Sequence, residues 1–499
     1  MQDQAAAEQT WRAEGTTETF DLVVVGAGVA GLNALYAATD YLPKGARVLL
    51  IDQKQGPGGM WNTAYDFVRL HQPHPMFTVG DVKWDWAKPR DYLAKRDEVQ
   101  THLASALGPV SNAVELEAAF QQTVVEAEEV QTDCGYQAKV VFRPNGADSP
   151  TRTVLAPLPI HAQGLNYTEA APLPLASSNV VSIIPQNLRQ TLNAHPSARL
   201  VVVGGGKTGM DTILAALDQD LNRKISLING SGTNFLNRTK YIPTGLKRWT
   251  KGELASRLFR DLALNFDGDN EDHTLSHLRT AHSTDPAGQN GTFLYGLQSE
   301  KERAEIDAGL SATLQDYLED VTDGSNGPAM MLRNGTKTPV EAGTIFVNCT
   351  GSFFRGAQMA DAIPLLSPNR TLIGVNARDG FHFLTSVAAF FMTHLFYRGE
   401  LLGKGFYRLD QEALFRQNRN AWVGASAAQA YLNQVIAVQA LPVTLLDRCG
   451  LDLDRWYPFP RRVAGLLKMK ASAKQDKAHC CATLNRVADR FGIRCEPIE

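Results

Sequence analysis

The chain has 499 residues, of which 44% are hydrophobic and 20% charged, so it can bury a large core and is not a disordered protein. At the usual domain size this length predicts roughly two to four domains. The formal net charge is −3 and there is no basic block, which gives no support for nucleic acid or an anionic membrane as a partner. The most apolar stretches are residues 22–38, broken by glycines, and 387–396, too short to span a bilayer.

The beginning of the chain, residues 1–20, is polar and acidic, which predicts a disordered lead-in and not a signal peptide. Six cysteines are scattered along the chain, a pattern that favours a reducing compartment and hence a cytoplasmic protein. The adjacent Cys480 and Cys481 are interpreted as neighbouring thiols without a redox role. A homo-oligomer is compatible with the sequence, which contains no specific signal for one.

A unit of strand, glycine-rich turn, helix and strand occurs twice, at residues 21–52 and 199–229. Each copy opens on a continuous apolar run, residues 22–25 and 200–203, as expected for a parallel strand that is buried on both faces. The sequence therefore predicts an α/β protein with two doubly wound, Rossmann-like nucleotide-binding domains, the second inserted into the first.

The first turn, residues 26–31, reads GAGVAG and lies between a strand and a helix. Gly26 permits the tight turn, Gly28 lets the backbone approach a pyrophosphate, and Gly31 lets the helix pack closely on the strand. The helix N-terminus offers free N–H groups to the phosphates. Asp52 ends the second strand, where its carboxylate would accept a hydrogen bond from a ribose hydroxyl and repel a 2′-phosphate. We predict that this turn binds FAD.

The second turn, residues 204–209, reads GGGKTG and repeats the spacing. Its three spaced glycines are Gly204, Gly206 and Gly209. Lys207 adds positive charge near a pyrophosphate, and Thr208 lies beside it at the start of the helix.

The second strand of this unit ends at the neutral Asn229, so a 2′-phosphate would not be repelled. Arg238 or Lys240 could supply the positive contact to that phosphate. We expect NADPH to be preferred over NADH. The alternative is a dinucleotide fold that packs but binds nothing.

Residues 58–62 read GGMWN, and residues 65–71 read YDFVRLH. Here the chain resembles the flavin-containing, Baeyer–Villiger and N-hydroxylating monooxygenases. Those families carry GGxW at this offset and a Tyr-x-x-x-x-x-(Asn/Asp) segment that passes the flavin ring. The later residues 346–351, FVNCTG, are similar to their Ala-Thr-Gly strand ending. The resemblance implies that Gly59 and Trp61 bind the flavin.

The resemblance covers about residues 21–77, 199–238 and 344–396, and three departures accompany it. The FxGxxxHxxx(W/Y/F) motif of these families is absent from residues 173–196, and their first Ala-Thr-Gly is AQG at residues 162–164. The third departure is His71, which stands where the families place Asn or Asp beside the flavin.

An imidazole at this position could donate a hydrogen bond and titrates near neutral pH, so we predict that His71 is catalytic. The alternative is that His71 and His74 only shape a rigid loop. We expect no metal site, since no third ligand at suitable spacing accompanies these two histidines.

Near the end of the resembling region, residues 379–382 read DGFH and precede a strongly apolar helix, expected at residues 385–397. Thr385 and Ser386 can cap its first turn. In two-domain flavoproteins the N-terminus of such a helix points at the pyrimidine end of the flavin, where its dipole would stabilise negative charge on the reduced ring.

These patterns predict three parts after the lead-in, and the second of them contains an insertion. Residues 21–195 and 340–400 form the FAD-binding domain, and residues 196–339 form the NAD(P)-binding domain. A polar insertion at about residues 250–339 covers the substrate, and residues 401–499 form a helical C-terminal region without an assigned function.

The resemblance implies an NAD(P)H-dependent monooxygenase that inserts one oxygen atom of O₂ into a small organic substrate by way of a peroxyflavin. The pattern does not indicate which substrate. A first alternative is a flavin-dependent dehydrogenase or oxidase that takes hydride directly from its substrate, with His71 as the base. A second is an FAD-binding scaffold or redox sensor without turnover. A disulfide reductase is disfavoured, because no Cys-x-x-Cys pair follows the first turn.

Overall fold

The computed structural model describes residues 17–146, 150–162, 170–284, 291–351, 354 and 363–499. Its first parallel sheet has the strand order β19-β8-β2-β3-β4. The strands are β2 (Leu22–Val25), β3 (Arg47–Asp52), β4 (Glu115–Phe120), β8 (Pro159–His161) and β19 (Ile373–Gly374). Helices α1 (Val29–Ala38), α2 (Arg96–Ser105) and α3 (Leu107–Ala113) pack on one face of this sheet.

The second parallel sheet has the order β14-β11-β10-β18-β9. The strands are β9 (Val181–Ile183), β10 (Leu200–Val203), β11 (Ile225–Ile228), β14 (Leu310–Leu314) and β18 (Ile345–Asn348). Helices α4 (Leu188–Ala194), α5 (Lys207–Gln219) and α10 (Glu300–Gly309) share a core with one face of it. All five strands come between β8 and β19 of the first sheet, so the prediction of an inserted second unit is confirmed.

The boundaries of the inserted unit differ from the prediction. β9 precedes the expected start at residue 196, and β18 follows the expected end at residue 339. β18 pairs in parallel with β10 over its whole length, so its apolar side chains belong to the second sheet and not to the first. Sequence patterns locate strands, but they do not show which of two similar sheets a strand joins.

The opposite face of each parallel sheet is covered by antiparallel strands. On the first sheet these are β5 (Gln122–Thr132), β6 (Gly135–Pro144) and β7 (Arg152–Ala156); on the second, β15 (Leu318–Gly324), β16 (Gly327–Leu332) and β17 (Lys337–Pro339). β1 (Glu18–Thr19) pairs with β7, so the end of the predicted disordered lead-in is ordered. Residues 1–16 of that lead-in lie outside the described part.

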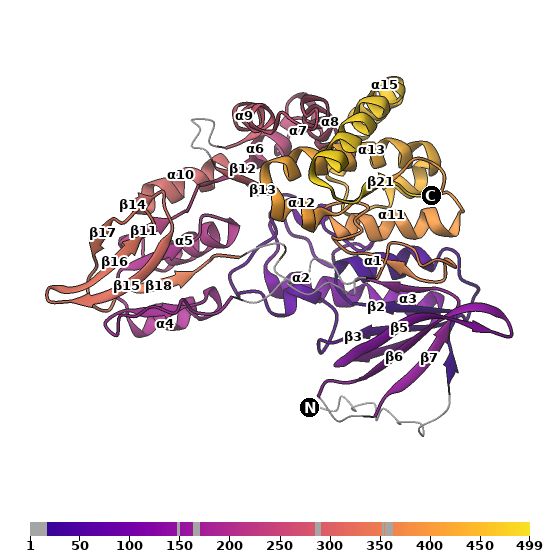
Figure 1. Cartoon of the computed structure of the whole chain (residues 1–499), viewed down its shortest axis with the longest axis horizontal. Helices are drawn as coiled ribbons and strands as arrows, with labels where there is room; N and C mark the ends of the chain where they lie inside the picture. The colour runs from indigo at the N-terminus through magenta and orange to yellow at the C-terminus, as the bar shows by residue number, and fades with distance from the viewer. Residues whose placement is uncertain (1–16, 147–149, 163–169, 285–290, 352–353, 355–362) are drawn as a thin grey trace.

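A helical layer completes the molecule and lies above the two sheets in Figure 1. It combines α8 (Ala255–Asn265) and α9 (Glu271–His282) with α13 (Arg419–Ala440) and α15 (Phe459–Phe491), and α11 (Thr385–Tyr397) joins it to α1. The remaining helices are α6 (Arg238–Tyr241), α7 (Lys247–Thr250), α12 (Gln411–Gln417) and α14 (Val443–Asp447). Strands β12 (Thr233–Asn237) and β13 (Thr292–Gln298) pair with each other, as do β20 (Tyr407–Leu409) and β21 (Cys495–Pro497).

The predicted insertion at residues 250–339 therefore does not form one unit, because it contributes to two different parts of the structure. α8 and α9 belong to the helical layer, whereas α10 and β14–β17 complete the second dinucleotide unit. The polar character of the segment did not reveal this division, because the outer strands of a small sheet and the exposed faces of helices are equally polar.

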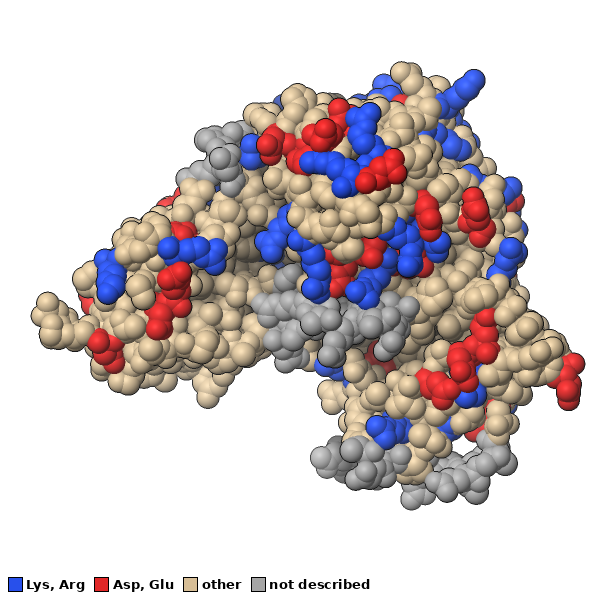
Figure 2. All heavy atoms as spheres, viewed as in Figure 1, with Lys and Arg blue, Asp and Glu red and all other residues tan. Residues whose placement is uncertain are grey.

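Charged side chains of both signs are interleaved on the face shown in Figure 2. Within the described residues, no helix combines the length and apolar character needed to cross a bilayer.

Candidate active site

The first glycine-rich turn lies at the carboxyl end of β2, where the chain passes into α1. Gly26 has φ +104°, and a Cβ on it would lie 2.4 Å from the carbonyl oxygen of Ala162, just after β8. A Cβ on Gly31 would lie 1.7 Å from the carbonyl oxygen of Gly26. The protein's own packing therefore requires glycine at both positions, as the turn and the helix–strand contact predict.

Gly28 is different, because its nearest described neighbour would leave room for a side chain. A Cβ there would meet the Cα of Gly59 at 3.5 Å, an ordinary contact. Gly28 is the N-cap of α1, and none of the described side chains caps this helix, so its first N–H groups are available to an anion. A pyrophosphate lying on this turn explains a glycine that the protein's packing does not require, so the residues fit FAD.

The GGMW segment packs directly on this turn. The Gly58 N–H donates to the Ala27 carbonyl at 2.9 Å, and a Cβ on Gly59 would lie 2.8 Å from the Cα of Gly28. Trp61 follows in a short 3₁₀ helix, with its ring edge-on to Phe77 at a centroid distance of 5.8 Å. Gly59 and Trp61 thus stand beside the turn that would bind FAD.

Asp52 connects the end of β3 to the same turn. Its Oδ2 accepts from the Ala27 N–H at 2.5 Å and its Oδ1 from the Lys54 N–H at 2.7 Å. Burial raises the pKa of this carboxyl above its ordinary value, although both N–H groups oppose the shift. Each oxygen keeps a lone pair for a ribose hydroxyl, but the carboxylate also holds the turn in shape. Replacing Asp52 would therefore disturb the turn as well as the ribose contact.

The second turn repeats this arrangement between β10 and α5. A Cβ on Gly204 would lie 2.7 Å from the Cys349 carbonyl oxygen, and one on Gly209 would lie 2.0 Å from the Gly204 carbonyl oxygen. A Cβ on Gly206 would meet none of the described atoms within 4 Å. Gly206 is the N-cap of α5, whose first residues are Lys207 and Thr208, and no described side chain caps the helix.

Asn229 lies at the end of β11, beside this turn, since a Cβ on Gly205 would be 2.7 Å from its Cβ. Its Oδ1 is buried and has no hydrogen-bond partner among the described residues. An orphaned buried acceptor is costly and fits a ribose hydroxyl as a partner. The residues of the second turn therefore fit a nicotinamide nucleotide.

Lys207 forms an ion pair with Asp211, one turn further along α5. Asp211 also accepts from the Tyr65 hydroxyl at 2.9 Å, and Tyr65 belongs to the first unit. Burial raises the pKa of Tyr65 well above its ordinary value. Lys207 was expected beside a pyrophosphate, whereas the structure ties it to a contact between the two units.

The two cationic side chains predicted to contact a 2′-phosphate also form ion pairs within the protein. Arg238 lies 2.8 Å from Glu302 and donates to the His71 carbonyl at 3.1 Å, and Lys240 lies 2.9 Å from Glu253. Arg303, which sequence reasoning did not single out, instead lines a cavity of about 130 Å³ together with Asn229.

His71 lies at the junction of the two units, beside Arg238 and near Lys207. Burial and these two positive charges lower the pKa of His71 to about 3. The expectation that it titrates near neutral pH is therefore wrong, and the imidazole is neutral under ordinary conditions. His74 contacts the Tyr92 carbonyl through Nδ1 at 3.2 Å and packs edge-on to Trp84, as expected for a residue that shapes the loop.

α11 begins at Thr385, as predicted, but its cap differs. The N-cap is Leu384, and within the described structure neither Thr385 nor Ser386 caps the first turn through its side chain. The Leu384 N–H donates to His382 Nδ1 at 2.9 Å, and burial lowers the pKa of His382 to about 3. α11 packs along α1, so the two helices present neighbouring, uncapped N-termini.

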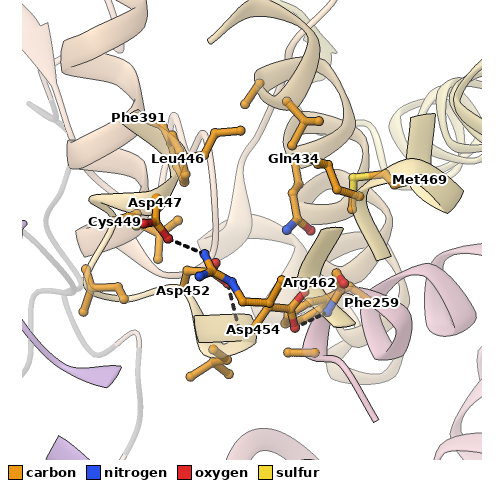
Figure 3. A pocket seen from close by; sticks show the side chains of 18 of the residues that line it. Phe259, Phe391, Gln434, Leu446, Asp447, Cys449, Asp452, Asp454, Arg462 and Met469 are labelled. Atoms are coloured by element: carbon orange, nitrogen blue, oxygen red, sulfur yellow. Dashed lines mark hydrogen bonds and ion pairs between the residues drawn. The ribbon is translucent and has the colours of Figure 1, made fainter. Parts of the chain in front are cut away.

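A cavity of about 410 Å³ opens where the chain enters α11 (Figure 3). Its walls are largely apolar and come from α8, α11, α13, α14 and α15, including Phe259, Val387, Phe391 and Met469. Figure 3 shows three carboxylates near Arg462, namely Asp447, Asp452 and Asp454. Arg462 donates to Asp447 at 2.6 Å. Sequence reasoning missed this cavity, because no motif marks the C-terminal helices that form it.

Asp452 and Asp454 are close enough to repel each other. Asp452 caps a short 3₁₀ helix by accepting from the Asp454 N–H at 2.9 Å. Burial and the neighbouring Asp454 charge raise the pKa of Asp452 to about 7. The carboxyl therefore binds a proton in the folded protein at pH values where the unfolded chain has lost it.

We predict that Gly28→Ala folds but is isolated largely without flavin. The added methyl group has room in the protein and occupies the space that a pyrophosphate needs. Flavin absorbance per protein and thermal unfolding measure the two effects. Gly108→Ala is the control, because its Cβ meets no described atom and it lies away from the turn. A yellow Gly28→Ala protein with full flavin content would refute the FAD assignment.

We predict that Asp452→Asn reduces the loss of stability as the pH rises. The folded pKa exceeds the unfolded one, so this residue stabilises the fold at pH 4 and below, and that contribution is lost between about pH 4 and 7. An amide can keep the cap hydrogen bond without ionising. The free energy of unfolding at pH 8 should therefore be about 1–2 kcal/mol higher in Asp452→Asn than in the wild type. Thermal unfolding at pH 5 and 8 measures it, with the exposed Asp272→Asn as control. If the stability of the wild type and of Asp452→Asn changed equally between pH 5 and 8, the raised pKa of Asp452 would be contradicted.

Comparison with known proteins gives a family match for part of the chain. Residues 20–240 match the family described as pyridine nucleotide-disulphide oxidoreductase. An uncharacterized protein of Mycobacterium tuberculosis is 30% identical over 217 residues, 41% of this chain and 37% of that protein, so the match spans little more than a third of the relative.

Two of the similar solved structures are monooxygenases. A flavin-containing monooxygenase from Stenotrophomonas maltophilia is 18% identical, with a TM-score of 0.42, covering 74% of this chain and 89% of that one. A cadaverine monooxygenase from Erwinia amylovora, bound to FAD, is 12% identical, with a TM-score of 0.48 and coverage of 77% and 94%. The family match at residues 20–240 supports the prediction of an oxidoreductase that uses a pyridine nucleotide.

Proposed function

We propose that the chain is an FAD-dependent monooxygenase that uses NADPH. In the overall reaction NADPH, a proton, O₂ and an organic substrate give NADP⁺, water and a substrate with one added oxygen atom. The observation that carries the proposal is a repeated one: each unit has a helix that no described side chain caps, and packing among the described residues does not require its N-cap glycine, Gly28 in the first and Gly206 in the second.

In this proposal the first unit holds FAD. The N–H groups at the start of α1 bind the pyrophosphate, Asp52 accepts from the ribose, and Gly58–Gly59 keep the turn covered from one side. The uncapped N-terminus of α11 presents its partial positive charge to the flavin ring. Bound FAD would supply two-electron exchange between the hydride donor and O₂.

The second unit would hold the nicotinamide nucleotide. The start of α5 binds the pyrophosphate, and Asn229 Oδ1 accepts from a ribose hydroxyl. Tyr65 and Asp211 hold this turn toward the first unit, where hydride must be delivered.

His71 acts as a neutral hydrogen-bond donor in this proposal. Its lowered pKa leaves one ring nitrogen protonated and one free, so it can donate without carrying charge. The same low pKa argues against the dehydrogenase or oxidase alternative, because a base of pKa about 3 has little affinity for a substrate proton at neutral pH.

The substrate is proposed to enter the cavity of about 410 Å³, since Phe381, His382 and Leu384, which lead into α11, line one of its walls. Its apolar lining favours a small molecule with an apolar body. α8 contributes Phe259, so part of the predicted covering insertion does line the cavity.

The name of the matched family includes disulfide reduction, which needs a pair of thiols beside the flavin. The first turn has no such pair in the sequence. Cys134, the cysteine of the first unit, lies in the exposed turn between β5 and β6. Cys349 lies beside the second turn, and burial raises its pKa to about 12, which suppresses the reactive thiolate.

We predict that NADPH bleaches the flavin anaerobically and that Gly206→Ala slows this step at least about 10-fold with unchanged FAD content. The added methyl group blocks only the approach of the nucleotide to α5. Stopped-flow absorbance measures the rate, with Gly108→Ala as control. Bleaching by an organic substrate alone would favour the dehydrogenase or oxidase. No bleaching by any donor would favour a scaffold.

We predict that His71→Ala leaves anaerobic reduction by NADPH nearly intact but raises hydrogen peroxide release about 10- to 100-fold, the effect of losing one hydrogen bond to a charged group. His71→Asn should restore much of the wild-type behaviour, because an amide also donates a hydrogen bond. Peroxide formed per NADPH consumed is the measurement. If His71→Ala instead abolished reduction, or both variants matched the wild type, the donor role would be rejected.

A further inference from the structure

Three side chains with metal-ligand chemistry converge where α8 and α9 meet in the helical layer. Asp261 extends from α8, and His277 and His282 extend from α9. Asp261 Oδ2 lies 2.5 Å from His277 Nε2 and 2.7 Å from His282 Nε2. The three ligand atoms all lie within 4.8 Å of one another. Two imidazoles therefore direct the same type of nitrogen at one carboxylate oxygen.

The surroundings of the cluster orient it for coordination. The second ring nitrogen of His282, Nδ1, is hydrogen-bonded to the Tyr241 hydroxyl. A metal-ligating histidine usually has such an oxygen partner on its far nitrogen, which sets the tautomer and the ring angle. His282 is almost fully buried, with 3% of its side chain exposed. It is thus a rigid ligand.

The other two ligands leave the cluster accessible. The side chains of His277 and Asp261 are 31% and 38% exposed, so an ion and water molecules can reach them from solvent. The ligand set is thus one carboxylate and two imidazoles. One anion and two imidazoles suit a divalent ion of the zinc type better than Mg²⁺ or Ca²⁺, which prefer oxygen ligands.

We propose that Asp261, His277 and His282 bind one divalent transition-metal ion of the zinc class, with water completing its coordination. Binding replaces the Nε2 protons, and His282 then carries its proton on Nδ1 and donates to Tyr241. This proposal is independent of the flavin chemistry and differs from the sequence-based expectation of no metal site, which considered only His71 and His74. Asp261 is a ligand that sequence spacing could not reveal, since it comes from a different helix.

The position of the cluster indicates a structural role for the ion. Tyr241 ends α6, which directly follows β12, while α8 and α9 belong to the helical layer. An ion held here would cross-link α8 to α9, and the hydrogen bond between His282 and Tyr241 would connect it to the segment leading from the second dinucleotide unit. Because it binds the folded form, it should raise the unfolding temperature of the protein.

The test uses the full-length protein without a tag, with its flavin bound and its metal removed by a chelator. Zn²⁺ and Co²⁺ are the probes. We expect one Zn²⁺ per chain after dialysis, a visible Co²⁺ absorption band in the difference spectrum, and a rise of about 3 °C in the unfolding temperature. His277→Gln should weaken Zn²⁺ binding at least about 100-fold while keeping a hydrogen bond to Asp261. Tyr241→Phe should weaken it about 10-fold.

His273→Ala is the matched control, because His273 lies exposed on the same helix outside the cluster. It should bind Zn²⁺ as the wild type does. His282→Ala, checked for folding by circular dichroism, should lose the Co²⁺ band. Zn²⁺ binding that is absent from the wild type, or unchanged in His277→Gln, would overturn the proposal and leave a hydrogen-bonded cluster.

Discussion

The structure depends on a close approach of backbone to backbone at the first glycine-rich turn. Gly59 lies against Gly28, and the Gly58 N–H donates to the Ala27 carbonyl, while Asp52 accepts from the N–H of the same residue. The turn is thus clamped from two directions by residues far apart in the sequence. What stays open is the start of α1, whose first N–H groups no described side chain caps. A rigid, open anion site follows from packing that excludes side chains.

Polar contacts join the two units, and Phe67 of the first unit also packs against the apolar core of the second. Tyr65 bonds to Asp211, and Arg238 reaches both Glu302 and the His71 carbonyl. Because Lys207 is paired with Asp211, a pyrophosphate at α5 would compete with Asp211 for the same cation. Nucleotide binding and the contact with Tyr65 are therefore linked through one carboxylate.

Local patterns predicted much of this structure. The apolar runs, the glycine spacing and the bounds of α11 all depend on neighbouring residues, and these predictions agree with the structure. The low pKa of His71 and the membership of β18 depend on residues far away in the sequence, and here the expectations failed. The ion pair of Arg238 with Glu302 also depends on distant residues, and the contact of Arg238 with a 2′-phosphate stays a prediction. The cavity was missed for the same reason, since its walls come from five helices without a motif.

The insertion of one unit into the other has a consequence for how the chain is made. The second sheet is complete once β18 has left the ribosome, because all its strands lie at residues 181–348. The first sheet must wait for β19, and its covering helix α11 comes later still. Pairings between distant segments form slowly, and domains tend to fold as units during synthesis. The inner unit can therefore fold first and bring the two halves of the outer one together, so the FAD-binding sheet is the last to close.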